Sequence, residues 1–329
     1  MYESLLAHLR GLKSVNVVEN APLSNYTRFG IGGPADVLID AFSESSLIAA
    51  LSAVRASGVP LEVIGEGSNL IVSDAGFRGV VLRFRGSEIE FDGTTRVNAA
   101  AGAVLQDLVD ETIGFGLAGV HTMTGIPGSV GAAVYGNAGA YGRSISQCIK
   151  SVRYYDGAAT SVKSNAGCEF HYRESTFKTH KQWVILSAEL ELERGDARSL
   201  ASKATCIRKI RDGKYPPAMR CAGSIFKNLI LSDLDARVQS RVPARIVKEG
   251  KVPAAWFLDE SGVKGMHEGG IEVAGYHANL IYNAGGGTAA DLCAVIVRCK
   301  QRVREHFGGA LVLEEEVQYV GFAAAVWMI

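Results

Sequence analysis

The run from Gly125 to Gly142 constrains the fold more than any other stretch of this chain. It reads GIPGSVGAAVYGNAGAYG and holds six glycines in eighteen residues. Glycine loses more conformational freedom on folding than any other residue, so such a run is a poor way to build an ordinary core. We therefore expect a rigid backbone bed against a flat or phosphorylated group. A flexible loop is the alternative, but it would carry more Ser, Lys and Glu.

A second glycine segment, Gly65-Glu66-Gly67-Ser68-Asn69, follows a predicted strand over residues 61–64. Its backbone N–H groups and short polar side chains suit a pyrophosphate, although an ordinary glycine turn is the alternative. It is not the G-x-G-x-x-G fingerprint, because no helix opens from it, and the chain has no Walker lysine motif. Together the two segments predict a large nucleotide cofactor that is held mainly by main-chain groups.

The chain's length and charge restrict its class. A chain of 329 residues is long enough for two or three lobes. Its 34 basic residues balance its 34 acidic ones, so it has no electrostatic footprint for nucleic acid or an anionic membrane. No stretch approaches the ~18 apolar residues of a membrane span, and the first residues lack a secretory signal. We expect a cytoplasmic protein without nucleic-acid partners.

The cysteines do not form a metal or disulfide pattern. None belongs to a C-x-x-C pair, and no histidine cluster lies nearby at zinc spacing. We expect free, mostly buried thiols, no metal site and no disulfide framework. The six are Cys148, Cys168, Cys206, Cys221, Cys293 and Cys299.

Hydrophobic periodicity predicts a mixed α+β chain with a boundary at Tyr215-Pro216-Pro217. Ser43 caps a helix that Gly58 ends, and Thr288 with Asp291 caps a long helix that Gly308 ends. Further helices are expected over residues 105–114, 196–211 and 254–261. Strands are expected over residues 36–41, 61–64, 70–72, 80–84, 96–101, 152–155, 183–192, 277–282 and 311–320.

Three further segments carry side chains that are candidates for catalysis or ligand binding. Arg173 can hold a carboxylate with its planar fork, although a surface arginine paired with Glu174 is the alternative. Gly223 presents Ser224, but no G-x-S-x-G elbow or neighbouring histidine supports a serine-hydrolase triad. The acids at 314–316 are typical of a solvated edge, unless a strand turns one or two of them into a cleft.

Taken in order, these pieces resemble the UDP-N-acetylenolpyruvoylglucosamine reductase (MurB) family, in its shorter subtype. Each motif alone is modest, but the ordered set is specific and covers nearly the whole chain. The matching stretches are YTRFGIGGPA, GEGSNLIVSDAGFRG, TGIPGSVGAAVYGNAGAYG, YRESTFK, AGSIFKN, VKGMHEGGIEVAGYHANLIYN and LEEEV.

The resemblance implies a monomeric flavoenzyme with non-covalent FAD and NADPH as reductant. Residues 1–84 and 85–212 would form the two lobes of a vanillyl-alcohol-oxidase (PCMH)-like FAD-binding unit. Residues 213–329 would form an α/β substrate-binding domain. NADPH would reduce FAD, and the hydride would then pass to UDP-N-acetylglucosamine enolpyruvate, giving UDP-N-acetylmuramate for peptidoglycan synthesis.

The resemblance also assigns three catalytic roles. Arg173 would stabilise the charge that builds on the enolpyruvyl carboxylate. Ser224 would protonate the carbon next to that carboxylate; a hydroxyl is a weak acid, but a carbanion is a strong base. Glu316 would have to be protonated, or act through a hydrogen bond, because two bare carboxylates repel each other.

The family match further implies two sets of binding residues. The expected cofactor-binding residues are Tyr26, Arg28, Gly65, Glu66, Gly67, Ser68, Asn69, Gly125, Ile126, Pro127, Gly128, Ser129, Gly131, Asn137, Gly139, Ala140 and Tyr141. The expected substrate-binding residues are Lys227, Asn228, Lys264, His277 and Asn279.

The chain departs from the family pattern at a few positions. Glu315 and Leu229 stand where the family usually has proline, and Ala132 or Ala133 replaces a usual glycine. The apolar tail at 322–329 has no implied role. Two alternatives stay open: a flavin oxidase or dehydrogenase of the same fold with another substrate, and a nucleotide-binding module without chemistry.

Overall fold

The computed structural model describes residues 2–309 and 311–323, so most of the apolar tail lies outside the described residues. The chain divides by contact into two units. The first contains residues 1–21, 35–66 and 78–213, and the second contains residues 22–34, 67–77 and 214–329. The division into domains at 84/85 and 212/213 stays a prediction.

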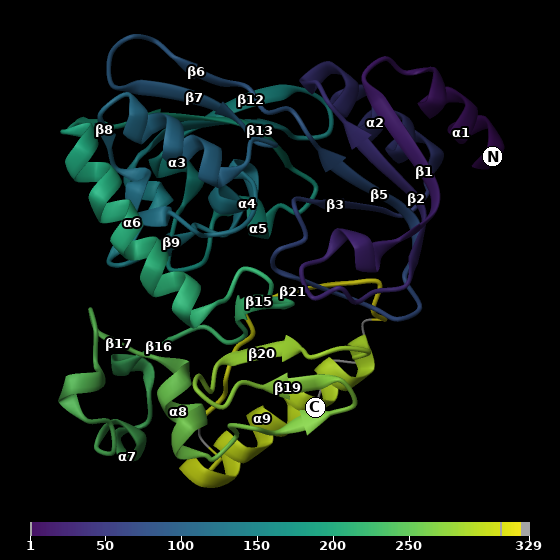
Figure 1. Cartoon of the computed structure of the whole chain (residues 1–329). Helices are drawn as coiled ribbons and strands as arrows, with labels where there is room; N and C mark the ends of the chain where they lie inside the picture. Colours follow the sequence, from purple (N-terminus) through teal and green to yellow (C-terminus); the bar gives the residue numbers. More distant parts are fainter. Residues whose placement is uncertain (1, 310, 324–329) are drawn as a thin grey trace. The chain divides into compact units, whose positions relative to one another are not determined.

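In the first unit, a four-stranded sheet has the order β1-β2-β5-β3. β3 and β5 run parallel, with Leu61 opposite Val80 and Ile64 opposite Arg83. Ser43 caps α2 by accepting a hydrogen bond from the Ser46 N–H, and Gly58 ends that helix in the left-handed conformation. The elements are α1 (Tyr2–Gly11), β1 (Val15–Pro22), β2 (Pro34–Ala41), α2 (Glu44–Ser57), β3 (Leu61–Ile64) and β5 (Phe77–Phe84), the purple to blue part of Figure 1.

The first unit also contains a five-stranded antiparallel sheet of order β12-β11-β13-β7-β6. Its strands are β6 (Ile89–Phe91), β7 (Arg96–Ala100), β11 (Ile149–Tyr155), β12 (Thr160–Ser164) and β13 (Val184–Glu191). Its helices are α3 (Leu105–Gly114), α4 (Val130–Tyr135), α5 (Thr176–Thr179) and α6 (Ala197–Lys214), of which α3, α4 and α6 lie on the same side of the sheet in Figure 1. Shorter elements are β8 (Leu117–Ala118), η2 (Val120–Met123), β9 (Gly139–Ala140), β10 (Arg143–Ser144), η3 (Ile145–Gln147), η4 (Ala166–Cys168) and β14 (Glu193–Arg194).

The two sheets of the first unit share buried side chains. One core cluster packs α2 residues such as Leu47 and Leu51 with Leu186 of β13 and Tyr155 of β11. A second cluster fills the space between the five-stranded sheet and α3, α4 and α6. Burial of apolar area at about 25 cal/mol per Å² therefore stabilises both sheets as parts of one unit.

In the second unit, the antiparallel sheet β15-β20-β19-β18 packs against α9. Thr288 and Asp291 form the capping box of α9, and Gly308 ends it with φ +80°. Its buried stripe is Leu292, Val295, Ile296, Cys299, Val303 and Phe307, together with Ala289. The elements are β15 (Cys221–Ser224), α8 (Ala254–Glu260), β18 (His267–Glu268), β19 (Ile271–Val273), β20 (Leu280–Asn283) and α9 (Ala289–Phe307). Shorter elements are β16 (Leu229–Ile230), η5 (Leu231–Asp233), α7 (Ala236–Gln239), η6 (Ala244–Ile246) and β17 (Lys251–Val252).

Two early segments of the chain belong to the second unit. β4 (Leu70–Val72) pairs in parallel with β21 (Gln318–Val320), and η1 (Leu23–Tyr26) begins the other segment. The Asp74 carboxylate accepts hydrogen bonds from the N–H groups of Ala289 and Ala290 at 2.8 and 2.9 Å. This carboxylate satisfies N–H groups in the first turn of α9, where a helix lacks internal acceptors.

The predicted elements are confirmed for most of the chain, but two strand predictions are wrong in extent. The strand expected over 277–282 begins only at Leu280, because the Leu280 N–H donates to the His277 carbonyl and forms a turn. The strand expected over 311–320 is limited to β21, and Glu315 makes only an isolated bridge with Phe226. The three apolar residues at 311–313 and the three glutamates at 314–316 therefore lie in irregular backbone before β21.

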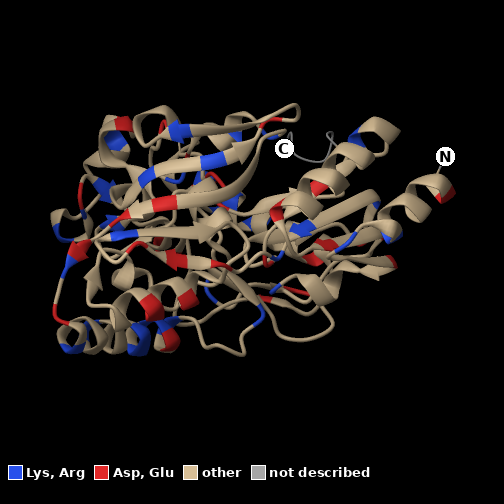
Figure 2. Cartoon of the chain, turned by 90° about the horizontal axis from the view of Figure 1, so that it is seen from above, with Lys and Arg blue, Asp and Glu red and all other residues tan. Residues whose placement is uncertain are grey.

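Charges and thiols agree with the expectations from composition. Figure 2 shows basic and acidic residues interspersed along the ribbon. The six cysteines are free; Cys148, Cys168, Cys221 and Cys299 are buried and Cys206 is exposed. No helix within residues 2–309 and 311–323 has the length and apolar character needed to cross a membrane.

Candidate active site

The two glycine segments meet within the first unit. The run from Gly125 to Gly142 contains α4, whose N-cap Ser129 accepts a hydrogen bond from the Ala132 N–H. A Cβ placed on Gly65 would lie 3.2 Å from the Ser129 Oγ and 3.4 Å from the Ala132 Cβ. Gly65, at the start of the GEGSN segment, therefore lies against the start of α4, as expected if both segments line one cofactor site. We call residues 125–142 together with Gly65 the glycine bed.

Several glycines of these segments pack against the chain's own backbone. A Cβ on Gly131 would lie 3.0 Å from the Ala101 carbonyl oxygen, and one on Gly139 would lie 2.4 Å from that of Arg143. In the second unit, a Cβ on Gly67 would lie 1.8 Å from the Tyr26 carbonyl oxygen. These three positions therefore require glycine because other backbone lies close to them, whereas the close approach to a cofactor stays a prediction. The segments that approach are parts of the same chain, which the sequence argument did not foresee.

Two non-glycine residues of the bed have left-handed backbone conformations. Asn137 has φ +42° and Tyr141 has φ +53°, a region that L-residues rarely adopt without support. The Asn137 amide donates to the His171 carbonyl at 2.7 Å and accepts from the Ser146 N–H at 3.3 Å. The side chain of Asn137, expected to bind the cofactor, thus fixes the shape of the bed. Tyr141 is 49% exposed.

Burial also shifts the pKa values of two side chains in or beside the bed, Tyr135 and Glu62. It raises the pKa of the Tyr135 hydroxyl, and the nearby Glu62 carboxylate raises it further. The same kind of burial raises the pKa of Glu62. Tyr135 therefore remains a neutral donor at physiological pH, and its ring offers an uncharged wall at the end of α4.

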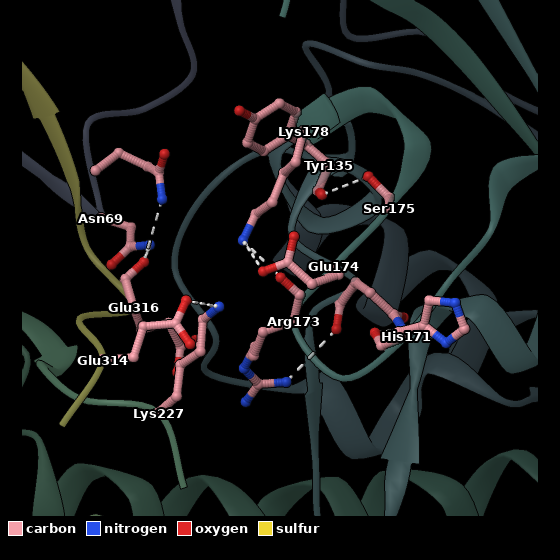
Figure 3. A network of polar contacts seen from close by, with 12 residues as sticks. Asn69, Tyr135, His171, Arg173, Glu174, Ser175, Lys178, Lys227, Glu314 and Glu316 are labelled. Atoms are coloured by element: carbon pink, nitrogen blue, oxygen red, sulfur yellow. Dashed lines mark hydrogen bonds and ion pairs between the residues drawn. The ribbon is translucent and has the colours of Figure 1, made fainter. Parts of the chain in front are cut away.

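Arg173 lies in the loop before α5, in the first unit, with φ +59°. Its guanidinium donates to the Gly139 carbonyl at 3.0 Å and to the Asn137 carbonyl at 3.5 Å, and it lies 5.2 Å from the Tyr172 ring centroid. Figure 3 shows the guanidinium extending away from Glu174. The fork of Arg173 is thus tied to the glycine bed, which favours a fixed position for its charge.

Lys178 supports this loop, and the sequence analysis missed it. Its ammonium donates to the Arg173 carbonyl at 2.5 Å and lies 3.5 Å from the Glu174 carboxylate (Figure 3). Ser175 adds a hydrogen bond from its hydroxyl to the Tyr135 carbonyl at 2.7 Å. A lysine at the end of the YRESTFK motif was the available signal, but nothing in the sequence indicates that it bonds a backbone carbonyl.

The remaining cofactor candidates divide between the two units. Glu66, in the first unit, forms an ion pair with Arg85. In the second unit, the Arg28 N–H donates to the Gly67 carbonyl at 3.0 Å, and the Asn69 amide donates to the Glu316 carbonyl at 3.0 Å. Arg28 and Asn69 therefore help to hold the GEGSN turn and the segment that carries Glu316.

Ser224 ends β15 in the second unit, where it pairs with Leu280 across the strand. Gly223 before it has φ +78°, and the pairing shifts register between Cys221 and Ser224. The half-buried Ser224 hydroxyl lies 2.9 Å from the Tyr215 hydroxyl. The left-handed glycine and the irregular register thus determine how the serine is presented.

The three consecutive glutamates have different surroundings. Glu314 pairs with Lys227 at 2.5 Å, and Glu315 pairs with Lys300 at 3.1 Å. The Glu316 N–H donates to the Ile225 carbonyl at 2.7 Å, next to Ser224. Lysines thus pair with the first two carboxylates within the unit, and the backbone of all three glutamates lies along the segment that follows Ser224. Glu315 therefore replaces a family proline without disturbing this backbone pairing.

The expected substrate-binding residues differ in how the structure uses them. Lys264 pairs with Asp259 at 2.7 Å, and the Asn228 amide oxygen accepts from the Ala254 N–H at 3.3 Å. Burial and, to a smaller extent, the Lys214 ammonium together lower the pKa of His277 to about 4, so its imidazole is neutral at physiological pH. Its Nδ1 is buried and has no hydrogen-bond partner among the described residues.

Asn279 is a structural residue in this state. It is 2% exposed, and its amide group both accepts from the Phe226 N–H and donates to the Phe226 carbonyl, each at 2.9 Å. This pair of bonds holds the backbone two residues after Ser224.

Replacing Asn279 with alanine should lower the stability of the protein. Asn279→Ala leaves two buried backbone groups of Phe226 without partners, and we expect a loss of about 2–4 kcal/mol in the free energy of unfolding. Denaturant unfolding measures this loss, with Asn98→Ala at an exposed strand position as a control that changes stability by less than about 0.5 kcal/mol. Equal stability of the two variants would contradict the structural role.

Two known domain families match this chain and define its class. An FAD-binding domain family matches residues 35–165, and a UDP-N-acetylenolpyruvoylglucosamine reductase C-terminal domain family matches residues 215–320. The FAD-binding match contains both glycine segments, so the chain is a flavoprotein of α+β fold with a C-terminal domain of the reductase type.

The chain belongs to the UDP-N-acetylenolpyruvoylglucosamine reductase family. The protein of that name from Solibacter usitatus is 56% identical over 95% of this chain and 99% of its own length. The one from Carboxydothermus hydrogenoformans is 36% identical over 92% of this chain and 93% of its own length. The crystal structure of the Thermus caldophilus enzyme superposes with a TM-score of 0.71 at 28% identity, covering 93% of this chain and 98% of that one.

Proposed function

We propose that this protein is an NADPH-dependent, FAD-containing reductase that converts UDP-N-acetylglucosamine enolpyruvate to UDP-N-acetylmuramate in peptidoglycan precursor synthesis. The observation that carries this proposal is the 56% identity, over nearly the whole of both chains, to a reductase named for that substrate. A cytoplasmic location and a monomeric state accompany the proposal as predictions from the sequence.

The residues of the first unit fit a bound FAD. At Gly65 a Cβ would fill the space beside Ser129 and Ala132, and the bed around them offers small side chains and backbone groups. Such a surface allows close approach of a flat ring system and of phosphates. When bound, FAD supplies the hydride chemistry, taking a hydride from NADPH and giving it up to the substrate alkene.

The chain's own residues would then control charge and protons. As the alkene is reduced, negative charge builds on the carbon next to the substrate carboxylate and spreads into that carboxylate. Arg173 is tied to the Gly139 and Asn137 carbonyls, so its guanidinium is a preorganised partner for this charge. Ser224 would donate its hydroxyl proton to that carbon. Glu316 would assist from the segment bonded to Ile225.

The first test is an absorption spectrum followed by an anaerobic titration. We expect the purified protein to be yellow with bound FAD, because the bed consists mainly of backbone groups and small side chains. NADPH should bleach the flavin absorption, and UDP-N-acetylglucosamine enolpyruvate should restore it much faster than oxygen does.

Two outcomes separate this function from the alternatives. A reduced protein that oxygen reoxidises quickly and the nucleotide sugar does not would indicate a flavin oxidase or dehydrogenase with another substrate. A colourless protein that does not take up FAD would contradict the cofactor assignment itself.

A further inference from the structure

The hydroxyl of Tyr215 lies 2.9 Å from the Ser224 Oγ, within hydrogen-bonding distance, and either oxygen can be the donor. Both side chains belong to the second unit, nine residues apart along the chain. The sequence indicated Tyr215 only as part of a predicted boundary with Pro216 and Pro217. Its contact with Ser224 indicates that its hydroxyl also affects the serine.

The structure fixes the position of Tyr215. Its ring is half-buried and packs against the apolar core of the second unit. The following prolines have restricted φ, and the Met219 N–H donates to the Pro216 carbonyl at 2.9 Å, which closes a turn. On the other side, the Tyr276 hydroxyl donates to the Lys214 carbonyl at 3.1 Å. Backbone contacts before and after Tyr215 therefore hold its hydroxyl close to Ser224.

A serine hydroxyl needs such a partner if it is to act as a proton donor. It carries one proton, and it rotates freely unless a neighbour occupies one of its lone pairs. When the Tyr215 hydroxyl donates to the Ser224 Oγ, the serine's own proton points away from Tyr215 and is available to another acceptor. A phenol is also a stronger acid than an aliphatic alcohol, so Tyr215 can return a proton that the serine has given up.

We propose that Tyr215 is a positioning residue for Ser224, which orients the serine hydroxyl and replaces its proton during substrate reduction. This inference rests on the proposed role of Ser224 as proton donor. The Ser224 O–H bond breaks as the new C–H bond forms on the substrate, and the Tyr215 proton moves to the Ser224 Oγ. The negative charge then resides on the Tyr215 phenolate, which water reprotonates.

The surroundings favour this direction of transfer. The Lys214 ammonium lies 5.0 Å from the Tyr215 ring centroid, where a positive charge stabilises a phenolate. The His277 ring lies 6.1 Å from the Tyr215 ring, centroid to centroid. Burial holds that imidazole neutral, so it neither adds a charge nor competes as an acid at physiological pH.

The test is Tyr215→Phe in the FAD-loaded protein, with each half-reaction measured separately by stopped-flow absorption. We expect NADPH to reduce the flavin at the wild-type rate. We expect reoxidation by saturating UDP-N-acetylglucosamine enolpyruvate to slow by about 10- to 100-fold, with little change in the substrate concentration for half-maximal rate. Tyr282→Phe is the matched control, because the Tyr282 hydroxyl bonds Glu272 in the same small sheet. It should leave both half-reactions unchanged.

Two further measurements distinguish a relay from a general structural effect. The reoxidation rate of the wild type should fall non-linearly with the deuterium fraction of the solvent, since two protons move, and the fall should become linear in Tyr215→Phe. In a Ser224→Ala background, Tyr215→Phe should have no further effect, because Tyr215 acts only through the serine.

An unchanged reoxidation rate in Tyr215→Phe would overturn the inference. So would an equal slowing in Tyr282→Phe, or a full-sized effect of Tyr215→Phe without the serine hydroxyl. A different result would contradict the proposed role of Ser224 itself: reoxidation of Ser224→Ala by the nucleotide sugar at the wild-type rate.

Discussion

In the Ser224→Ala variant, NADPH should reduce the bound FAD at nearly the wild-type rate, whereas reoxidation by UDP-N-acetylglucosamine enolpyruvate should slow by about three orders of magnitude or more. The substitution removes the proposed proton donor for the substrate carbon. It leaves the backbone at the end of β15 free to keep its conformation, since the left-handed residue is Gly223 and not Ser224. The defect should therefore appear only in the half-reaction that needs a proton on carbon.

Single-turnover absorption changes measure the two half-reactions, and the free energy of unfolding shows whether the variant is intact. Ser240→Ala is a suitable control, because that serine lies in the same unit and its hydroxyl bonds the Arg237 carbonyl. The control should behave as the wild type. An equal loss in both half-reactions of Ser224→Ala would count against the proton-donor role, because flavin reduction by NADPH needs no such proton.

Arg173→Lys should slow the second half-reaction by about 100-fold, and Arg173→Gln by about 1,000-fold. Lysine keeps the positive charge but lacks the planar fork that reaches the Gly139 and Asn137 carbonyls. Glutamine loses the charge as well. The order of the two variants, glutamine slower than lysine, separates charge from geometry.

Reoxidation by the nucleotide sugar, measured over a range of substrate concentrations, tests this order. Arg96→Lys provides the matched control, since Arg96 forms an exposed pair with Glu191 at 3.0 Å and such pairs contribute little. If both Arg173 variants turned over like this control, the guanidinium would have no part in stabilising the substrate's charge.

Composition alone pointed to the two glycine segments as a candidate cofactor site. The roles of Arg173, Ser224 and Glu316 came from the family resemblance and not from their spacing, and these roles stay predictions until the variants are made. The arrangement of contacts was less predictable. The glutamates at 314 and 315 pair with Lys227 and Lys300, which no motif indicates.

The residues that hold the candidate groups in place were largely missed. Lys178 bonds the Arg173 carbonyl, and Tyr215 contacts Ser224. Asn137 and Asn279 were expected to bind ligands, but their amides bond the backbone of His171 and Phe226. A side chain's partner depends on which distant backbone segments meet, and that information is not local in sequence.

The sequence by itself determined the elements whose start and end signals are local. α9 is the clearest case, because the Thr288–Asp291 capping box, the apolar stripe and Gly308 all act within the helix. The tertiary structure alone decided that Gly67 and Gly131 pack against the chain's own backbone, and that residues 311–317 lie outside a regular strand. These outcomes depend on hydrogen bonds and close packing between segments far apart in the chain, which local propensity does not encode.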